Sequence, residues 1–191
     1  MLIFIRNIFC CLILIAVSPM IVISIFFIFL ENGLPVFFRQ NRVGLDQHTF
    51  VMYKIRTMKK GAPSIGTHEI DKSYNLKIGS ILRKLKIDEI PQLFNVIKGE
   101  LNLIGFRPGL ENQDQLNLER NRGGVFNHMP GITGLAQVTG FDMSNPEKLS
   151  KIDKIYYDKK SVKLDFQILI CTLSGLFRKK LMLLVKDLGD V

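Results

Sequence analysis

From Asn7 to Leu30 the chain carries no charged side chain, and Arg6 and Glu31 bound this apolar run. An α-helix of about 24 residues is roughly 36 Å long, whereas the hydrocarbon core of a bilayer is roughly 30 Å thick. The run is therefore long enough to cross a membrane. This feature constrains the fold more than any other, and the simplest prediction from it is one transmembrane span.

Ser18 and Pro19 fall in the middle of this run. Proline removes a backbone hydrogen bond and bends a helix, so the run divides into halves of about 11 or 12 residues, each roughly 17 Å long. Such halves reach only about half of the hydrocarbon core. A helix broken at Ser18-Pro19 that enters and leaves by one membrane face also fits, with Arg6, Arg39 and Arg42 on the same side. The residues alone leave both arrangements open.

The remaining sequence is that of an ordinary α/β domain, and its charge is basic. The chain has 26 basic and 17 acidic side chains and a net charge of +9. Such a charge is typical of proteins that bind nucleic acid or an anionic membrane surface. The apolar run favours the membrane, and most phenylalanines lie in apolar segments instead of alternating with basic residues. We therefore expect membrane phospholipid, and no nucleic acid, among the partners.

The three cysteines do not make a disulfide framework. Cys10 and Cys11 are adjacent inside the apolar run, and Cys171 lies in another apolar stretch. Reduced, buried cysteines of this kind are expected in a protein that faces the cytoplasm.

The expected organisation is a membrane helix over residues 1–32 followed by a small domain over residues 33–191. Two short strands are predicted on either side of a turn at Gly44. A basic amphipathic helix is predicted over residues 76–87, and another helix is predicted after Pro146.

The C-terminal stretch, residues 166–186, is apolar around the basic cluster Arg178, Lys179 and Lys180. It suits an interfacial helix on anionic lipid or, equally well, a core helix with a basic end.

Two adjacent carboxylates, Asp88 and Glu89, open a short predicted helix over roughly residues 89–98. Asp88 is a good N-cap, and Gly99 is a typical stop signal. The spacing predicts that one stripe of the helix packs inward while the polar residues point elsewhere. The inward stripe is Ile90, Leu93, Phe94 and Ile97, and the polar residues are Gln92, Asn95 and Lys98. The pair would then stand at the positive end of a helix dipole, where an anionic phosphate is also favoured.

Capping alone would explain an Asp-Glu pair, but the neighbouring residues favour chemistry. Arg83, Lys84 and Lys86 precede the pair and Arg107 follows it. A carboxylate nucleophile approaches a diphosphate only when cations neutralise the phosphate charge. Two carboxylates could also hold magnesium, which prefers oxygen ligands and keeps several waters.

A glycine-rich stretch, PGITGLAQVTG, contains Gly131, Gly134 and Gly140, which allow tight turns or close backbone approach to a ligand. Gln137 is its polar residue best suited to face a site. The predicted site residues are therefore the carboxylates Asp88 and Glu89, as catalytic groups and magnesium ligands, together with a substrate-binding set. That set is Arg39, Arg56, Arg83, Arg107 and Gln137.

These motifs together resemble the bacterial sugar transferase family, the small monotopic phosphoglycosyl transferases. The resemblance covers nearly the whole chain, from the Ser18-Pro19 break to about Thr172, and its motifs occur in one order. They are GLPVFFRQNRVG, YKIRTM, LRKLKIDEIPQLFNVIKGELNLIGFRP and PGITGLAQV, followed by Asp153, Tyr156 and Asp165.

The resemblance implies a helix-rich α/β monotopic membrane protein: a re-entrant helix broken at Ser18-Pro19, and a cytoplasmic domain resting on the bacterial inner membrane through amphipathic helices. It implies transfer of a sugar-1-phosphate from a UDP-sugar to undecaprenyl phosphate with release of UMP, which starts lipid-linked glycan assembly. Asp88 would be the nucleophile of a covalent intermediate and Glu89 its partner, with magnesium required.

The chain departs from the family pattern at three positions. Phe106 stands where the family usually has proline, and Thr139 and Phe141 stand where it usually has asparagine and arginine. These departures affect the expected sugar specificity more than the reaction class. Two other functions remain open: a non-catalytic, membrane-anchored basic binding protein and an inactive relative of the transferases.

Overall fold

The computed structural model describes residues 2–63 and 71–186, and the chain divides into two compact units. Unit 1 comprises residues 1–41 and 51–99, and unit 2 comprises residues 42–50 and 100–191. The described part is helix-rich, and its strands form two small two-stranded sheets, β1-β2 and β3-β4. The predicted mixed α/β class is confirmed, while the division into a membrane helix and one domain stays a prediction.

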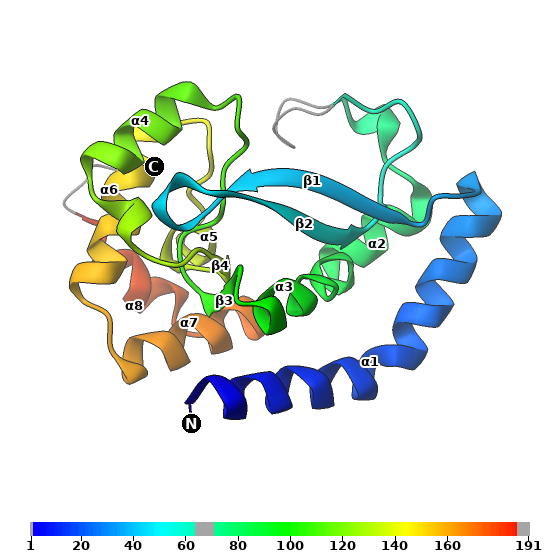
Figure 1. Ribbon diagram of the computed structural model, residues 1–191, viewed down its shortest axis with the longest axis horizontal. Helices are drawn as coiled ribbons and strands as arrows, with labels where there is room; N and C mark the ends of the chain where they lie inside the picture. Colours follow the sequence, from blue (N-terminus) through cyan, green and yellow to red (C-terminus); the bar gives the residue numbers. More distant parts are fainter. Residues whose placement is uncertain (1, 64–70, 187–191) are drawn as a thin grey trace. The chain divides into compact units, whose positions relative to one another are not determined.

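Unit 1 begins with α1 (Leu2–Asn32), which contains the whole apolar run and Pro19. The helix is continuous, and its axis bends near the middle (Figure 1). Its most apolar stretch has a mean hydropathy of 2.9, and only 11% of the residues there are buried. An exposed apolar helix of this length could cross a membrane.

Both ends of α1 are attached to other parts of unit 1. Near the first end, Nη2 of Arg6 donates a hydrogen bond to the carbonyl of Val96 at 3.0 Å. At the other end, the Glu31 carboxylate accepts hydrogen bonds from the backbone N–H groups of Lys77 and Ile78, at 2.7 and 3.2 Å. Because Glu31 supplies acceptors to the first N–H groups of α2 (Lys77–Lys84), it stabilises the start of that helix.

The two predicted strands are confirmed as β1 (Phe37–Val43) and β2 (Thr49–Ile55), which form a hairpin around the 3-10 helix η1 (Leu45–Gln47) (Figure 1). The hairpin tip, residues 42–50, belongs to unit 2. The 3-10 helix η2 (Lys72–Tyr74) and α2 follow, so the predicted basic helix is also confirmed. A buried apolar cluster holds unit 1 together: Ile28, Val36, Ile55, Leu76, Leu82 and Ile87.

The helix beside the Asp88-Glu89 pair begins later than predicted. The chain first forms the 3-10 helix η3 (Ile87–Glu89), and α3 (Gln92–Lys98) starts only after Pro91. The tight turn is closed by the Ile90 N–H donating to the Ile87 carbonyl at 3.2 Å. The prediction that Asp88 caps a helix from residue 89 is therefore wrong, whereas the predicted end at Gly99, with φ 80°, is confirmed.

The buried face of α3 also differs from the predicted stripe. Phe94 is 53% exposed, whereas Gln92 and Asn95 are 1% and 0% exposed. The reason is that the Asn95 amide hydrogen-bonds the backbone of β2: Nδ2 donates to the Val51 carbonyl at 2.7 Å, and Oδ1 accepts from the Tyr53 N–H at 3.2 Å. Because both ends of the Asn95 amide are hydrogen-bonded, its burial leaves no polar group unpaired. A polar residue can therefore take the inward position.

Unit 2 is built around the parallel pair β3 (Asn102–Ile104) and β4 (Gly131–Thr133), with Asn102 opposite Gly131 and Ile104 opposite Thr133. Its helices, in chain order, are α4 (Asp114–Arg122), η4 (Val125–Asn127), α5 (Leu135–Thr139), α6 (Pro146–Asp158), α7 (Val162–Ser174) and α8 (Arg178–Leu183). α4 packs along α6 (Figure 1). The helix predicted after Pro146 is confirmed as α6, and the Asn145 side chain caps it by accepting the Lys148 N–H at 3.1 Å.

The glycines of the PGITG stretch serve close backbone packing inside unit 2. A Cβ atom on Gly131 would lie 2.1 Å from the backbone nitrogen of Gly105, and one on Gly134 would lie 2.0 Å from its carbonyl oxygen. Side chains at these two positions would force the segments apart. Close approach to Gly105 therefore explains both glycines.

The apolar C-terminal stretch forms two helices, because the chain turns at Gly175 and Phe177, whose φ angles are 71° and 69°. α7 buries Ile168 and Cys171 in the core, while Leu173 and Leu176 are exposed. The stretch therefore combines features of both predicted alternatives: one face packs in the core, as in a core helix, and other apolar side chains are exposed, as in an interfacial helix. Contact of that surface with lipid stays a prediction.

Candidate active site

The carboxyl group of Asp88 lies in the turn between α2 and α3. Lys86 adopts a left-handed conformation, with φ 61°, which ends the α2 segment and starts η3. Asp88 is 6% exposed, so its carboxylate is largely removed from bulk water. A buried carboxylate in a tight turn is held in a fixed position, as a nucleophile requires.

Glu89 is paired with a cation from the hairpin. Nζ of Lys54, on β2, lies 2.8 Å from Oε1 of Glu89, and their side chains are 15% and 13% exposed. Lys54 was not among the site residues predicted from the sequence. The available signal was strand alternation, which places Lys54 on the same side of β2 as the buried Met52.

Arg83, in the last turn of α2, is fixed by neutral partners. Its Nε donates to Oγ1 of Thr57 at 2.7 Å, and its Nη1 donates to Oδ1 of Asn75 at 3.3 Å. Burial lowers the pKa of the guanidinium, and the carboxylates of Asp88 and Glu89 act in the opposite direction. The guanidinium therefore lies within electrostatic range of both site carboxylates.

A glycine makes this position of Arg83 possible. A Cβ atom on Gly79 would lie 2.2 Å from the Thr57 carbonyl oxygen, so only glycine lets α2 approach the chain so closely there. The same close approach brings Arg83, one turn later, to the hydroxyl of Thr57.

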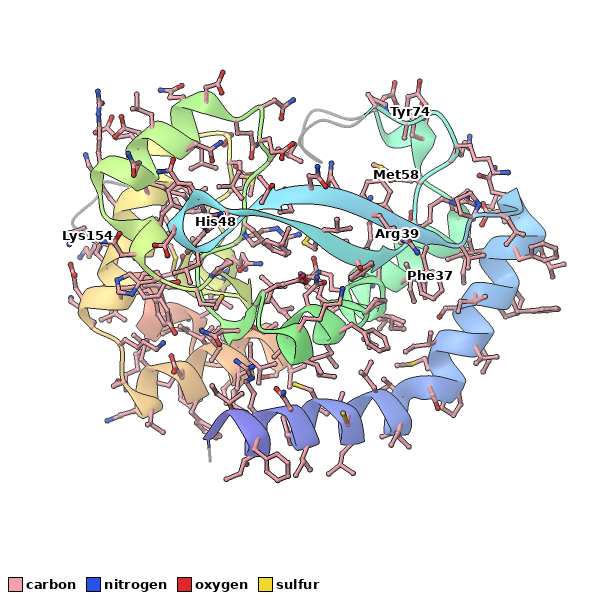
Figure 2. The ribbon with its side chains drawn as sticks, viewed as in Figure 1. Phe37, Arg39, His48, Met58, Tyr74 and Lys154 are labelled. Carbon is pink, nitrogen blue, oxygen red and sulfur yellow. The ribbon has the colours of Figure 1, made fainter. Side chains whose placement is uncertain are left out.

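The other two predicted arginines of unit 1 have different surroundings. Arg56 is buried, and its Nη2 donates to the carbonyls of Asn32 and Gly33 at 3.2 and 2.6 Å, which ties it to the end of α1. Burial lowers its pKa. Arg39, labelled in Figure 2, is an exposed residue of β1, with its guanidinium carbon 5.9 Å from the centre of the Tyr53 ring. A substrate role for either residue stays a prediction.

A row of buried polar residues along the η3–α3 segment was not predicted from the sequence. Asp88, Gln92 and Asn95, spaced i, i+4 and i+7, are all buried. The segment faces β2 at both ends of this row, since Glu89 bonds Lys54 and Asn95 bonds Tyr53. The Nε2 atom of Gln92 has no hydrogen-bond partner among the described residues. The signal was the helical spacing itself, which fits a polar face as well as it fits the predicted apolar one.

The remaining predicted site residues, Arg107 and Gln137, belong to unit 2. Arg107 is half-buried directly after Phe106, and Gln137 is half-buried in α5, where its Nε2 donates to the Ile132 carbonyl at 3.1 Å. Phe106 is buried and packs against Phe126. The structure brings Asp88, Glu89 and Arg83 together in unit 1, and it describes Arg107 and Gln137 within the other unit.

The two other departures from the family pattern are also internal to unit 2. The Thr139 hydroxyl donates to the carbonyl of Leu135 at 2.7 Å, inside its own helix. Phe141 packs against the apolar core, with Nζ of Lys148 5.2 Å from the centre of its ring. Both side chains are thus occupied by contacts within the protein.

The late motif residues Asp153, Tyr156 and Asp165 form buried structural contacts. Nη2 of Arg120 lies 2.7 Å from Oδ2 of Asp153, and both side chains are buried. Burial raises the pKa of Asp153, and Arg120 opposes that shift. The Tyr156 hydroxyl donates to Oδ1 of Asp165 at 2.8 Å, which links α6 to α7.

A magnesium ion fits the donor chemistry of the pair, because Asp88 and Glu89, neighbours in the chain, both offer carboxylate oxygens. Within residues 2–63 and 71–186, no group of three or more His, Cys, Asp and Glu side chains comes together. An ion held by this pair would therefore take its other ligands from phosphate oxygens and water, as magnesium commonly does at phosphate-binding sites.

Comparison with known proteins gives consistent matches. The family model described as "Bacterial sugar transferase" matches residues 3–179. The chain is 42% identical over 156 residues to the "Uncharacterized sugar transferase EpsL" of Bacillus subtilis, covering 81% of this chain and 76% of that protein. It is 36% identical to the "UDP-N-acetylgalactosamine-undecaprenyl-phosphate N-acetylgalactosaminephosphotransferase" of Aeromonas hydrophila, covering 80% of this chain and 37% of that protein.

A third relative is the "UDP-glucose:undecaprenyl-phosphate glucose-1-phosphate transferase" of Xanthomonas campestris. It is 35% identical, and the match covers 72% of this chain and 31% of that protein. The chain therefore spans most of the Bacillus protein but only about a third of the Aeromonas and Xanthomonas proteins.

Proposed function

The chain belongs to the bacterial sugar transferase family, and from that premise we propose that it transfers a sugar-1-phosphate from a UDP-sugar to undecaprenyl phosphate. The Aeromonas and Xanthomonas relatives are named for transfers of this type. The product, a sugar joined to undecaprenol through a diphosphate, would begin a lipid-linked glycan such as an O-antigen, capsule, exopolysaccharide or glycoprotein glycan.

One observation carries the proposal: the buried Asp88 lies within electrostatic range of the Arg83 guanidinium and is followed by an ion-paired glutamate. Asp88 is 6% exposed, and the charge of Arg83 acts on the same two carboxylates. Burial frees a carboxylate from a full hydration shell, and a fixed cation offsets its repulsion from a diphosphate. These are the requirements of nucleophilic attack on an anionic phosphorus centre.

We propose a double displacement. A carboxylate oxygen of Asp88 attacks the phosphorus that carries the sugar, and the bond from that phosphorus to the bridging oxygen breaks, so that UMP leaves with the oxygen. A phosphate oxygen of undecaprenyl phosphate then attacks the same phosphorus and releases the Asp88 carboxylate. One small site can thus handle a soluble and a lipid substrate in turn.

Magnesium is part of this proposal, with the carboxylates of Asp88 and Glu89 as its protein ligands. When bound, the ion would neutralise phosphate charge and so favour approach of an anionic nucleophile. Lys54 keeps the Glu89 side chain in place through the 2.8 Å ion pair.

We also propose that α1 is a re-entrant membrane helix and that the site faces the cytoplasm at the inner membrane. Support comes from the two attachments of α1, Arg6 to Val96 and Glu31 to the start of α2, which both join it to unit 1. A straight helix of about 31 residues would hold its ends roughly 46 Å apart. When both ends of α1 lie at the same membrane face, the site stays at the level of the lipid headgroups, where the phosphate of undecaprenyl phosphate lies.

A UMP-release screen over a panel of UDP-sugars tests the proposed reaction. Purified protein in undecaprenyl phosphate-containing vesicles should release UMP from at least one donor when magnesium is present, and Asp88→Asn should not. Folded wild-type protein that releases no UMP from any donor would instead indicate an inactive relative or a non-catalytic binding protein.

A further inference from the structure

The side chain of Gln92 is a buried donor without an acceptor in residues 2–63 and 71–186. It is 1% exposed, and its Nε2 has no hydrogen-bond partner among the described residues. Leaving such a donor unpaired destabilises a fold by about 1–3 kcal/mol. A buried, unpaired donor that destabilises the fold is expected at a position where it hydrogen-bonds a ligand.

The position of Gln92 connects this donor to the site. The chain winds continuously through the region, since the Leu93 N–H donates to the Ile90 carbonyl at 3.0 Å directly after the η3 turn. Gln92 follows Asp88 by four residues, across the turn between η3 and α3, and both side chains are buried. In this segment Glu89 bonds Lys54 and Asn95 bonds Tyr53, both on β2, and Gln92 lies between these two residues in the chain.

The other unpaired groups of unit 1 indicate the kind of ligand. The buried side-chain atoms of unit 1 that lack a partner within its described residues are Nε2 of Gln92 and the Nε and Nη1 atoms of Arg56. All three carry N–H groups, so the buried side-chain atoms of this unit that lack a partner among the described residues are all donors. Such donors are complementary to an anionic ligand rich in acceptor oxygens, such as a phosphoryl group.

We propose that Gln92 contacts the substrate: its amide N–H donates to a non-bridging oxygen of the phosphoryl group transferred to and from Asp88. This inference rests on the proposed function and adds a residue to it. The contact forms only when the phosphoryl group is present, so the amide stabilises the transferred group and contributes nothing to the stability of the free protein.

The test compares Gln92→Met, which keeps length and removes the donor, with Asn95→Leu as the matched control. Both residues are buried amides of α3, but only Asn95 has both amide ends bonded to β2. We expect Gln92→Met to keep or raise the melting temperature of the free protein and Asn95→Leu to lower it. With the UDP-sugar found in the screen, Gln92→Met should lower kcat/KM about 10- to 100-fold.

A second readout does not depend on turnover. In the absence of undecaprenyl phosphate, part of the protein should carry the phosphosugar adduct, which intact-mass spectrometry after a rapid quench measures. This fraction should be lower for Gln92→Met than for the wild type. Gln92→Glu serves as a second variant in case the methionine does not fit. It should reduce the adduct further, because it places a possible negative charge beside an anionic group.

Two outcomes would overturn the inference while leaving the proposed function intact. A Gln92→Met variant with wild-type kcat/KM and adduct level would show that the donor has no role in transfer. A melting temperature lowered as much as in Asn95→Leu would make Gln92 a structural residue. Wild-type protein that neither releases UMP nor forms an adduct would refute the proposed function and this inference together.

Discussion

Nζ of Lys54 and Oε1 of Glu89 are 2.8 Å apart, so strand β2 holds one carboxylate of the Asp88-Glu89 pair. The two residues are far apart in the sequence, and no local pattern joins them. The contact gives Glu89 a fixed direction that the backbone turn alone would not provide. It also places a cation directly on the pair, in addition to Arg83, whose guanidinium lies within electrostatic range.

Changing Lys54 to methionine should lower UMP release by about tenfold, because Glu89 loses its partner and its position. Stability should fall by about 1–3 kcal/mol, since the partly buried Glu89 carboxylate loses its 2.8 Å ion pair with Lys54. The double variant Lys54→Met with Glu89→Gln should regain most of that stability but none of the activity. Recovery of activity in the double variant would show that the ion pair is only structural.

Asp88→Asn should abolish turnover with little change in melting temperature. The substitution preserves the shape of the buried side chain and removes the nucleophilic oxygen charge. Because η3 and α3 have no side-chain cap hydrogen bond, no helix cap is lost. UMP release and adduct mass measure the effect, and more than a trace of either in a clean preparation would contradict the covalent mechanism.

Much of the fold follows from local sequence signals, and the errors have a common cause. Strands around Gly44, the helix after Pro146 and the stop at Gly99 were predicted correctly, because turn and cap residues act locally. The inward face of α3 was predicted only in part: Leu93 is buried as predicted, but Phe94 is exposed and Asn95 is buried by its bonds to the distant strand β2.

The candidate site shows the same division between local and distant information. Asp88 and Glu89 were selected from adjacent residues and their charged neighbours. Lys54 and Gln92 were not, because their significance depends on the packing of β2 against the η3–α3 segment.

Arg120→Met should destabilise the protein by about 3–5 kcal/mol, because it leaves the buried Asp153 without its cation. The expected result is a large fall in melting temperature. Adding Asp153→Leu should recover most of the loss, since both charges are then gone and the volume remains apolar. Equal melting temperatures for wild type and Arg120→Met would contradict this assignment.

The stability of the protein should depend on the protonation of His128. The His128 ring stacks on the Tyr157 ring with their centroids 4.0 Å apart. Desolvation lowers the pKa of His128 below 6.5, and the charges of Lys160 and Lys154 lower it further, whereas the charge of Asp158 opposes the shift. As the pH is lowered through 6.5, the imidazole is protonated in the unfolded chain before it is protonated in the folded protein. The free energy of unfolding therefore decreases as the pH is lowered, until the folded imidazole is also protonated.

The substitution His128→Phe keeps the stacked ring and removes the proton site. Its melting temperature should fall less than that of the wild type between pH 7.5 and pH 5, and the difference between the two curves isolates the histidine. Parallel curves would show that His128 does not contribute to the pH dependence.

The membrane arrangement gives the last prediction: residues before Arg6 and the chain after Glu31 lie on the same, cytoplasmic side. Two observations support this arrangement: the half-length apolar segments around Ser18-Pro19, and the attachment of both ends of α1 to the rest of unit 1. In a background without Cys10, Cys11 and Cys171, a cysteine at position 3 should resist an impermeant thiol reagent on intact spheroplasts and react after lysis. The substitution Pro19→Leu should favour a continuous spanning helix, expose position 3 to the reagent and lower activity, because the site would leave the headgroup plane. Labelling of position 3 from outside in the protein that retains Pro19 would establish an ordinary span and refute the re-entrant arrangement.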